Sequence, residues 1–539
     1  MRDMAELRLF GRSAAPGVAK GVVAVLDAEK PSRRAAGARA EEILALRRAV
    51  SQALAEVMDL ADKASGEAAD MLGFQVAMLA DDELIGPALE ALEAGESAAA
   101  AWEAAMDAEI AGYRDAGDDH FAARTADLED IRDRVLGHLT PGAAGPVIPA
   151  GSVVVAADLP ISRFLAIDWA RGGAIVLTQG SPSSHVAMLA RARGVPMVVG
   201  LGADAVVMAG REALVDAATG EVVLDPTETT RIAFAAKAQT EKNTNAARAA
   251  FLAGPAVTKD GTRIALNLNV ASADELDGID PAICDGIGLV RTELLFHAPG
   301  RLPDEEAQLR TYRRIVAWSK GRPVTIRTLD AGGDKPIPGV TIDGESNPFL
   351  GVRGIRLSLR NPALFLTQLR ALARASAEGD LRIMLPMVTV PAELEASRKL
   401  LAEALASLSR DKVPAGRPRL GIMVEVPAAA IAIDLFDADF FSIGSNDLTQ
   451  YVTAAGRDIG AVAELADPVS PAVLRLVAAV VRHGRETGRE VSLCGDAGGD
   501  PRAIGALLRA GLRSLSVAPG SAGAAKQAIA AVDLREAQP

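Results

Sequence analysis

Residues 419–447, RLGIMVEVPAAAIAIDLFDADFFSIGSND, contain the pattern that decides the fold of the second half of the chain. Two apolar runs, residues 419–425 and 439–444, are each followed by polar residues, Glu425 in the first case and Asn446-Asp447 in the second. Helix-forming residues lie between them. A buried strand, a helical segment and a second buried strand form the repeating unit of a parallel sheet.

The same unit recurs from residue 260 onward. Eight strands are predicted, at residues 263–270, 286–291, 323–328, 382–388, 419–425, 439–444, 490–494 and 513–517. Helical stretches separate most pairs. Eight such units favour a (β/α)8 TIM barrel, although a doubly wound open sheet remains an alternative at this point.

Polar side chains follow the predicted strands at the end where such barrels carry their active sites. They are Arg291, Arg327, Arg353, Glu425, Asn446, Asp447 and Cys494. Arginines make bidentate bonds to phosphate or carboxylate, and two carboxylates suit Mg²⁺. The pattern predicts a pocket for a small, highly anionic, metal-chelated molecule. The thiol is either an acid or nucleophile, or inert packing.

Composition narrows the class of protein. The 539 residues carry a net charge of −13, which argues against general affinity for nucleic acid. Two cysteines cannot form a disulfide framework, and no apolar run approaches the roughly 18 residues of a membrane helix. The sequence therefore indicates a soluble, cytoplasmic protein of several domains, with no membrane insertion.

The first half predicts a small α/β domain, residues 1–34 and 143–227, interrupted by a helical bundle at 35–142. A helical linker, 228–255, leads to the barrel, 256–539. In the α/β part, GSPSSHVAMLAR at 180–191 places His185 at the start of a short helix that the preceding serines can cap. Taken alone, this segment is better explained as a capped loop than as a site.

With these residues in view, the chain resembles Enzyme I of the bacterial phosphotransferase system, the phosphoenolpyruvate–protein phosphotransferases. The resemblance covers nearly the whole chain. It rests on the motifs SAAPGVAKG, DLEDIRDRVLGHL, SSHVAMLAR, GIGLVRTELLF, RTLDAGGDKP, NPFLGVRGIR, IMLPMV, GIMVEVPAAA, FFSIGSNDLTQY and CGDAGGD, which occur in that order.

The resemblance implies that His185 is phosphorylated on Nε2 and that Cys494 protonates the enolate to give pyruvate. It implies substrate binding by Arg291, Arg327, Arg353, Asn446, Asp447 and Arg457, and Mg²⁺ ligation by Glu425 and Asp447. It further implies a swivelling phosphohistidine domain, partner docking on the helical insert, and a barrel that binds phosphoenolpyruvate and forms a homodimer. The phosphate then passes to HPr, a small histidine carrier, as the first step of sugar uptake or of a related regulatory relay.

Several positions depart from the family pattern. The family commonly has Gly-Gly-Arg-Thr-Ser-His where this chain has 180–185, a threonine where Pro160 stands, and a histidine at Gln75. In the barrel, Val426, Gly456 and Asp496 replace a common threonine, aspartate and glutamate. The donor half is therefore expected to be intact, while the identity of the acceptor is open.

Two other classes compete with this interpretation. Pyruvate phosphate dikinase and phosphoenolpyruvate synthase share the swivelling domain and the barrel, but the roughly 145 residues before the histidine domain are too few for their nucleotide-binding domain. A catalytically reduced, sensory paralogue with a dedicated non-sugar acceptor is the second alternative. The joint presence of His185, Glu425, Asp447 and Cys494 argues against it.

Overall fold

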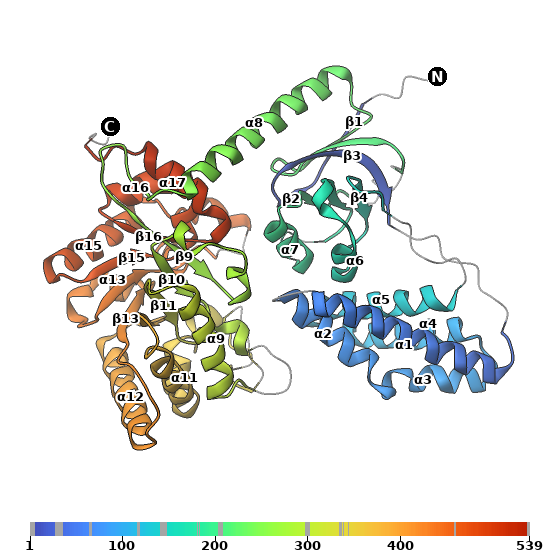
Figure 1. The fold of residues 1–539 in the computed structure, drawn as a ribbon, viewed down its shortest axis with the longest axis horizontal. Coiled ribbons are helices and arrows are strands. Elements are labelled where there is room, and N and C mark those ends of the chain that lie inside the picture. Colours follow the sequence, from blue (N-terminus) through green and yellow to red (C-terminus); the bar gives the residue numbers. More distant parts are fainter. Residues whose placement is uncertain are drawn as a thin grey trace. The chain divides into compact units, whose positions relative to one another are not determined.

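The computed structural model describes residues 6–26, 36–63, 67–115, 119–140, 148–180, 182, 184–202, 209–296, 302–333, 337, 339–342, 344–456 and 460–535. The chain divides into two compact units, residues 1–243 and 244–539. The division falls within α8, Glu228–Leu252 (Figure 1). Among the described residues, no helix is both long and apolar enough to cross a membrane.

The helical part of the first unit contains α1 (Arg39–Lys63), α2 (Glu67–Leu79), α3 (Asp82–Glu93), α4 (Ala98–Asp115) and α5 (Asp119–Leu139). Its core contains Leu46, Ala53 and Val57 of α1, which the helical period places on one face. Trp102 of α4 is completely buried in the same core. The predicted helical bundle is thus present among the described residues.

The α/β part of the first unit is an eight-stranded mixed sheet in the order β1-β8-β7-β3-β4-β5-β6-β2. Its strands are β1 (Leu7–Phe10), β2 (Arg12–Ala15), β3 (Val18–Val25), β4 (Val153–Ala156), β5 (Ala174–Leu177), β6 (Met197–Val199), β7 (Glu212–Asp216) and β8 (Glu221–Leu224). Strands β3 to β6 run parallel. The helices α6 (Ile161–Ala166) and α7 (His185–Arg193) belong to this part.

The second unit is a closed barrel of eight parallel strands, which excludes the open sheet. The strands are β9 (Ala265–Val270), β10 (Gly286–Val290), β11 (Val324–Arg327), β12 (Leu381–Leu385), β13 (Arg419–Val424), β14 (Phe440–Ile443), β15 (Glu490–Leu493) and β16 (Ser514–Val517). All eight predicted strands are therefore confirmed, within a few residues at their ends.

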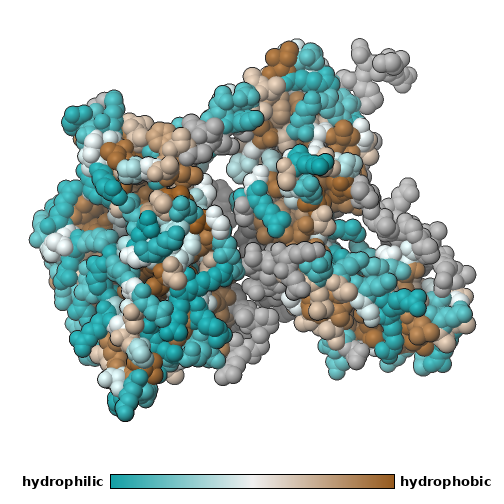
Figure 2. Space-filling model, in the orientation of Figure 1, coloured by the Kyte–Doolittle hydropathy of each residue, from teal (hydrophilic) through white to brown (hydrophobic). Residues whose placement is uncertain are grey.

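Helices surround this barrel (Figure 1). They are α9 (Glu305–Trp318), α10 (Ile355–Arg360), α11 (Pro362–Ala375), α12 (Pro391–Arg410), α13 (Pro427–Ile431), α14 (Ser445–Thr453), α15 (Pro471–Thr487), α16 (Pro501–Arg509) and α17 (Ala522–Ala531). Five of them begin with proline, whose fixed φ suits the first helical position. One large apolar core joins their inner faces to the strands. Hydrophilic residues dominate much of the visible surface of this unit, with smaller apolar areas between them (Figure 2).

Candidate active site

A hollow of about 300 Å³ lies where β10, β11, β13, β14 and β15 end. It is lined by Leu289, Arg291, Arg327, Met423, Glu425, Gly444, Asn446, Asp447, Cys494, Gly495 and Asp496. We call this hollow the arginine pocket. Six residues predicted from the sequence line it, because the carboxyl ends of all eight parallel strands open on the same side of the barrel.

Two arginines beside this pocket are held by buried carboxylates. Arg327 Nη1 lies 2.9 Å from Asp330 Oδ2, and its Nη2 lies 3.0 Å from Glu293 Oε1. Arg353 Nη2 lies 2.9 Å from the same Asp330 oxygen. Asp330 is completely buried, so it fixes both guanidinium groups away from bulk water.

Arg353 also reaches the opposite side of the pocket. Its Nη1 lies 3.3 Å from Asp447 Oδ1 and donates to the Tyr451 hydroxyl at 3.4 Å. Burial works to lower the pKa of Arg353, but Asp330 and Asp447 outweigh burial and raise it. The guanidinium is therefore a permanent cation that neutralises charge on Asp447.

Glu425 is a buried carboxyl group with too little positive charge around it. Burial, followed by the charges of Asp447 and Asp330, raises the pKa of Glu425 to about 8. Its Oε1 accepts a hydrogen bond from Met387 N at 2.6 Å. A cation beside Glu425 and Asp447 would relieve the repulsion between their charges.

Cys494 forms part of the apolar floor of the arginine pocket, together with Leu289 and Met423. Burial raises the pKa of the Cys494 thiol to about 11, although a hydrogen bond with Ser442 opposes the shift. At neutral pH this group carries its proton. It is thus suited to donate a proton and poorly suited to act as a thiolate.

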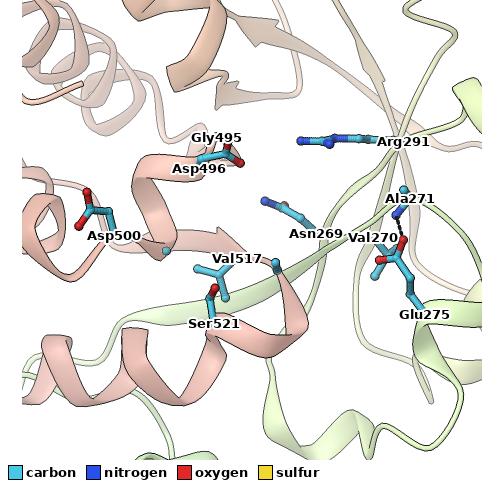
Figure 3. Close-up of a pocket in the computed structure, with 12 residues that line it drawn as sticks. Asn269, Val270, Ala271, Glu275, Arg291, Gly495, Asp496, Asp500, Val517 and Ser521 are labelled. Atoms are coloured by element: carbon cyan, nitrogen blue, oxygen red, sulfur yellow. Dashed lines mark hydrogen bonds between the residues drawn. The ribbon is translucent and has the colours of Figure 1, made fainter. Parts of the chain in front are cut away.

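A second hollow, of about 470 Å³, adjoins the arginine pocket at the ends of β9, β10, β15 and β16. The two share Arg291, Gly495 and Asp496 (Figure 3). Arg291 extends into the hollow, and its side chain makes no hydrogen bond or ion pair with any described residue. This guanidinium is therefore available to an anionic ligand.

Three family models match the chain. They are the PEP-binding domain of PEP-utilising enzymes over residues 245–534, the mobile domain over 148–220, and the N-terminal domain over 10–124. The chain belongs to the PEP-utilising enzymes. The mobile-domain match includes His185, and the PEP-binding match includes every residue of the arginine pocket.

Several relatives of this chain are named phosphoenolpyruvate–protein phosphotransferase. They confirm the resemblance to that family. The phosphotransferase of Streptomyces coelicolor is 37% identical over 96% of this chain and 92% of its own length. That of Listeria innocua is 36% identical over 87% and 83%. The multiphosphoryl transfer protein of Xanthomonas campestris is 36% identical over 97% of this chain, which spans only 63% of that relative.

The structure describes the backbone at His185. His185 is the first residue of α7, and Ser184 Oγ caps the helix by accepting from Ala187 N at 3.3 Å, as predicted. Gly194 ends the helix with a φ of 65°. The His185 side chain and Arg457 lie outside the described residues.

The loop before His185 lacks the arginine that the family commonly has there, but two arginines elsewhere hold its backbone. Arg12 Nη2 donates to Gly180 O at 3.2 Å, and Arg191 Nη1 donates to Pro182 O at 2.8 Å. The same Arg191 nitrogen also donates to Ala14 O in β2. Loop and helix are thereby tied to an edge of the sheet.

Asp330, Glu293 and Tyr451 lie within the motifs RTLDAGGDKP, GIGLVRTELLF and FFSIGSNDLTQY, but the sequence did not predict a role for them. Tyr451 lies four residues after Asp447 on α14, so the two share one helix face. Its hydroxyl donates to Phe349 O at 2.6 Å. That helical spacing is the one signal that could have identified it.

Proposed function

We propose that this chain transfers the phosphoryl group of phosphoenolpyruvate to His185, and then to a histidine of a small carrier protein, with release of pyruvate. The observation that carries the proposal is the arginine pocket. Arginines, two carboxylates and a protonated thiol converge there on a volume suited to one small anion. The family models and relatives support the same substrate.

In the donor step, Arg291 and Arg327 bind the phosphate and carboxylate of the substrate by charge-assisted hydrogen bonds. The bond between phosphorus and the enol oxygen breaks, its electron pair stays on that oxygen, and Nε2 of His185 bonds to phosphorus. The arginines stabilise the charge that develops on the leaving enolate. The Cys494 thiol gives its proton to the methylene carbon, and solvent restores the thiol.

Mg²⁺ is proposed as the cofactor, held by Glu425 and Asp447. The described residues contain no group of three or more side chains of His, Cys, Asp or Glu that could hold a metal. Two carboxylates with substrate oxygens are nevertheless the usual environment of Mg²⁺, and the raised pKa of Glu425 indicates a site short of positive charge. When bound, the ion supplies charge neutralisation at the phosphoryl oxygens.

On the acceptor side, His185 opens a nine-residue helix, where backbone N–H groups favour an anion such as a phosphorylated imidazole. The helical insert is proposed to dock the carrier. Movement of the domain bearing His185 about α8 would let the same side chain visit the donor site and the carrier in turn. The four domain boundaries that the sequence predicts are proposed together with this movement.

A homodimer formed through the barrel is also proposed. Exposed apolar side chains lie in the segments that connect the strands from β11 to β15, at Leu350, Val390, Ile431, Leu435 and Leu465. Arg356 joins the first two of these segments by bonding Leu350 O and Thr389 Oγ1. Exposed apolar side chains of this kind are suited to self-association. A sedimentation experiment that finds only monomers at micromolar concentration would contradict it.

The proposed setting is the cytoplasm, where the reaction would begin sugar uptake or a regulatory relay. The test combines the chain, phosphoenolpyruvate, Mg²⁺ and each small histidine carrier of the same cell, with pyruvate measured by a coupled dehydrogenase. Continuous pyruvate release that requires one carrier supports the proposal. Pyruvate release at the same rate without any carrier would contradict the second transfer.

A further inference from the structure

Asn446 and Asp496 form a pair of reciprocal hydrogen bonds between the first turn of α14 and the short 3-10 helix that follows β15. Asn446, at the start of α14, donates from Nδ2 to Asp496 Oδ2 at 2.8 Å. Asp496 N donates to Asn446 Oδ1 at 2.9 Å. A backbone N–H can only donate and a carboxylate can only accept, so the two bonds together permit a single orientation of the carboxamide.

Close packing of the preceding residues brings this pair together. A Cβ added to Gly495 would lie 1.9 Å from Ser445 Oγ and 2.6 Å from Ser445 N. The two segments therefore approach to a separation that only glycine permits. Ser445 is followed in α14 by Asn446 and Asp447, and Gly495 follows Cys494. The pair thus links the first turn of α14 to the strand end that carries the thiol.

Asp496 also lines three neighbouring hollows. It lines the arginine pocket, the adjoining hollow of about 470 Å³ and a third of about 290 Å³. Figure 3 shows its side chain and that of Arg291 entering the second hollow from different elements. Asn446 lines the arginine pocket and the third hollow. With one N–H bound to Asp496, the second N–H of its amide is left for a ligand.

We infer that Asp496 is a positioning residue that acts through Asn446. Its carboxylate fixes the Asn446 amide with a donor N–H facing the substrate, and its backbone keeps the first turn of α14 in register with Cys494. The inference rests on the proposed function, because the ligand of Asn446 is taken to be phosphoenolpyruvate. It concerns a position where this chain has aspartate and the resembling family commonly has glutamate.

A double-mutant cycle tests this inference. We expect Asp496→Ala to lower kcat/KM for phosphoenolpyruvate by roughly 10- to 100-fold, mainly through KM, since a charge-assisted hydrogen bond that orients a ligand donor is lost. Asp496→Asn retains an acceptor oxygen and should recover most of the loss. Asp496→Ala combined with Asn446→Ala should be no worse than Asn446→Ala alone, because each removes the same interaction.

Asp500 provides the matched control. It lines the second and third hollows but not the arginine pocket, and its carboxylate caps α16 by accepting from Arg502 N at 2.9 Å. Asp500→Ala should lower the melting temperature and leave the kinetic constants unchanged. Asp496→Ala should show the reverse pattern, since its side chain is exposed and caps no helix.

Two results would overturn the inference. One is a double mutant whose loss equals the product of the two single losses, and the other is an Asp496→Ala enzyme with unchanged KM. The same variants are then compared by the dissociation constant of phosphoenolpyruvate, measured by calorimetry with Mg²⁺ present. A wild-type chain that binds without turnover would thus refute the proposed function alone, and the cycle would still decide the role of Asp496.

Discussion

Replacing Gly495 by alanine should lower both the rate of catalysis and the stability of the fold. The backbone at Gly495 has φ −83° and ψ 172°, which any residue adopts, so alanine brings no conformational strain there. The damage is steric. The new Cβ would lie 1.9 Å from Ser445 Oγ, 2.6 Å from Ser445 N and 2.9 Å from Ser445 Cβ.

The size of the effect follows from which of these atoms can move. The Ser445 hydroxyl can rotate away, but its backbone nitrogen belongs to the first residue of α14. Restoring normal contact requires the two segments to move apart by roughly 1 Å. This movement displaces Asn446 and Asp447 relative to Cys494. Overpacking of this kind costs about 1–3 kcal/mol of stability. A misplacement of about 1 Å between reacting groups costs about 100-fold in rate.

The assay is steady-state pyruvate release together with thermal melting. Gly520→Ala is the control, because an added Cβ there would meet nothing within 4 Å. Gly495→Ala with Ser445→Ala should recover only part of the activity, since the contact with the backbone nitrogen remains. A Gly495→Ala enzyme with the kcat/KM of the Gly520→Ala control would show that the close contact with Ser445 does not position the catalytic groups.

Three further outcomes are expected. Arg291→Met should lower kcat/KM by at least about 10-fold without loss of thermal stability, since the side chain makes no hydrogen bond or ion pair with any described residue. Arg502→Met should be neutral, and equal constants for the two variants would contradict this. Glu425→Gln should raise the Mg²⁺ concentration for half-maximal pyruvate release by at least about 10-fold. If that concentration is unchanged, Glu425 is not a ligand of the metal. The raised pKa of about 11 leaves roughly one Cys494 thiol in a thousand ionised at pH 8. Iodoacetamide should therefore modify Cys494 only after denaturation. Rapid alkylation of Cys494 in the native chain, mapped by mass spectrometry, would show that the thiol is not buried.

The barrel was predictable because its signal is local. Each strand is a short apolar run with a polar end, and eight such runs with helices between them leave few alternatives. The grouping of Arg291, Arg327, Glu425, Asp447 and Cys494 followed from that topology alone. Parallel strands present their carboxyl ends on one side, so residues far apart in sequence meet without any knowledge of side-chain geometry.

The partners of these residues were not predictable in the same way. That Asp330 holds two arginines depends on side-chain directions in a closed barrel, and the pairing of Asn446 with Asp496 depends on the close approach at Gly495. The raised pKa of Glu425 depends on burial first, which a linear pattern does not report. Local sequence thus predicted which candidate site residues lie together, and tertiary packing decides which side chains hold them.

Phosphorylation of His185 by phosphoenolpyruvate is the most direct test of the central claim. The wild-type chain and a His185→Ala variant are incubated with Mg²⁺ and phosphoenolpyruvate labelled with ³²P, and the label is mapped to peptides under alkaline conditions that preserve phosphohistidine. Acid-labile label is expected in the wild type, confined to the peptide that contains His185, and none is expected in the variant. Equal labelling of both chains, or label on another peptide, would contradict it.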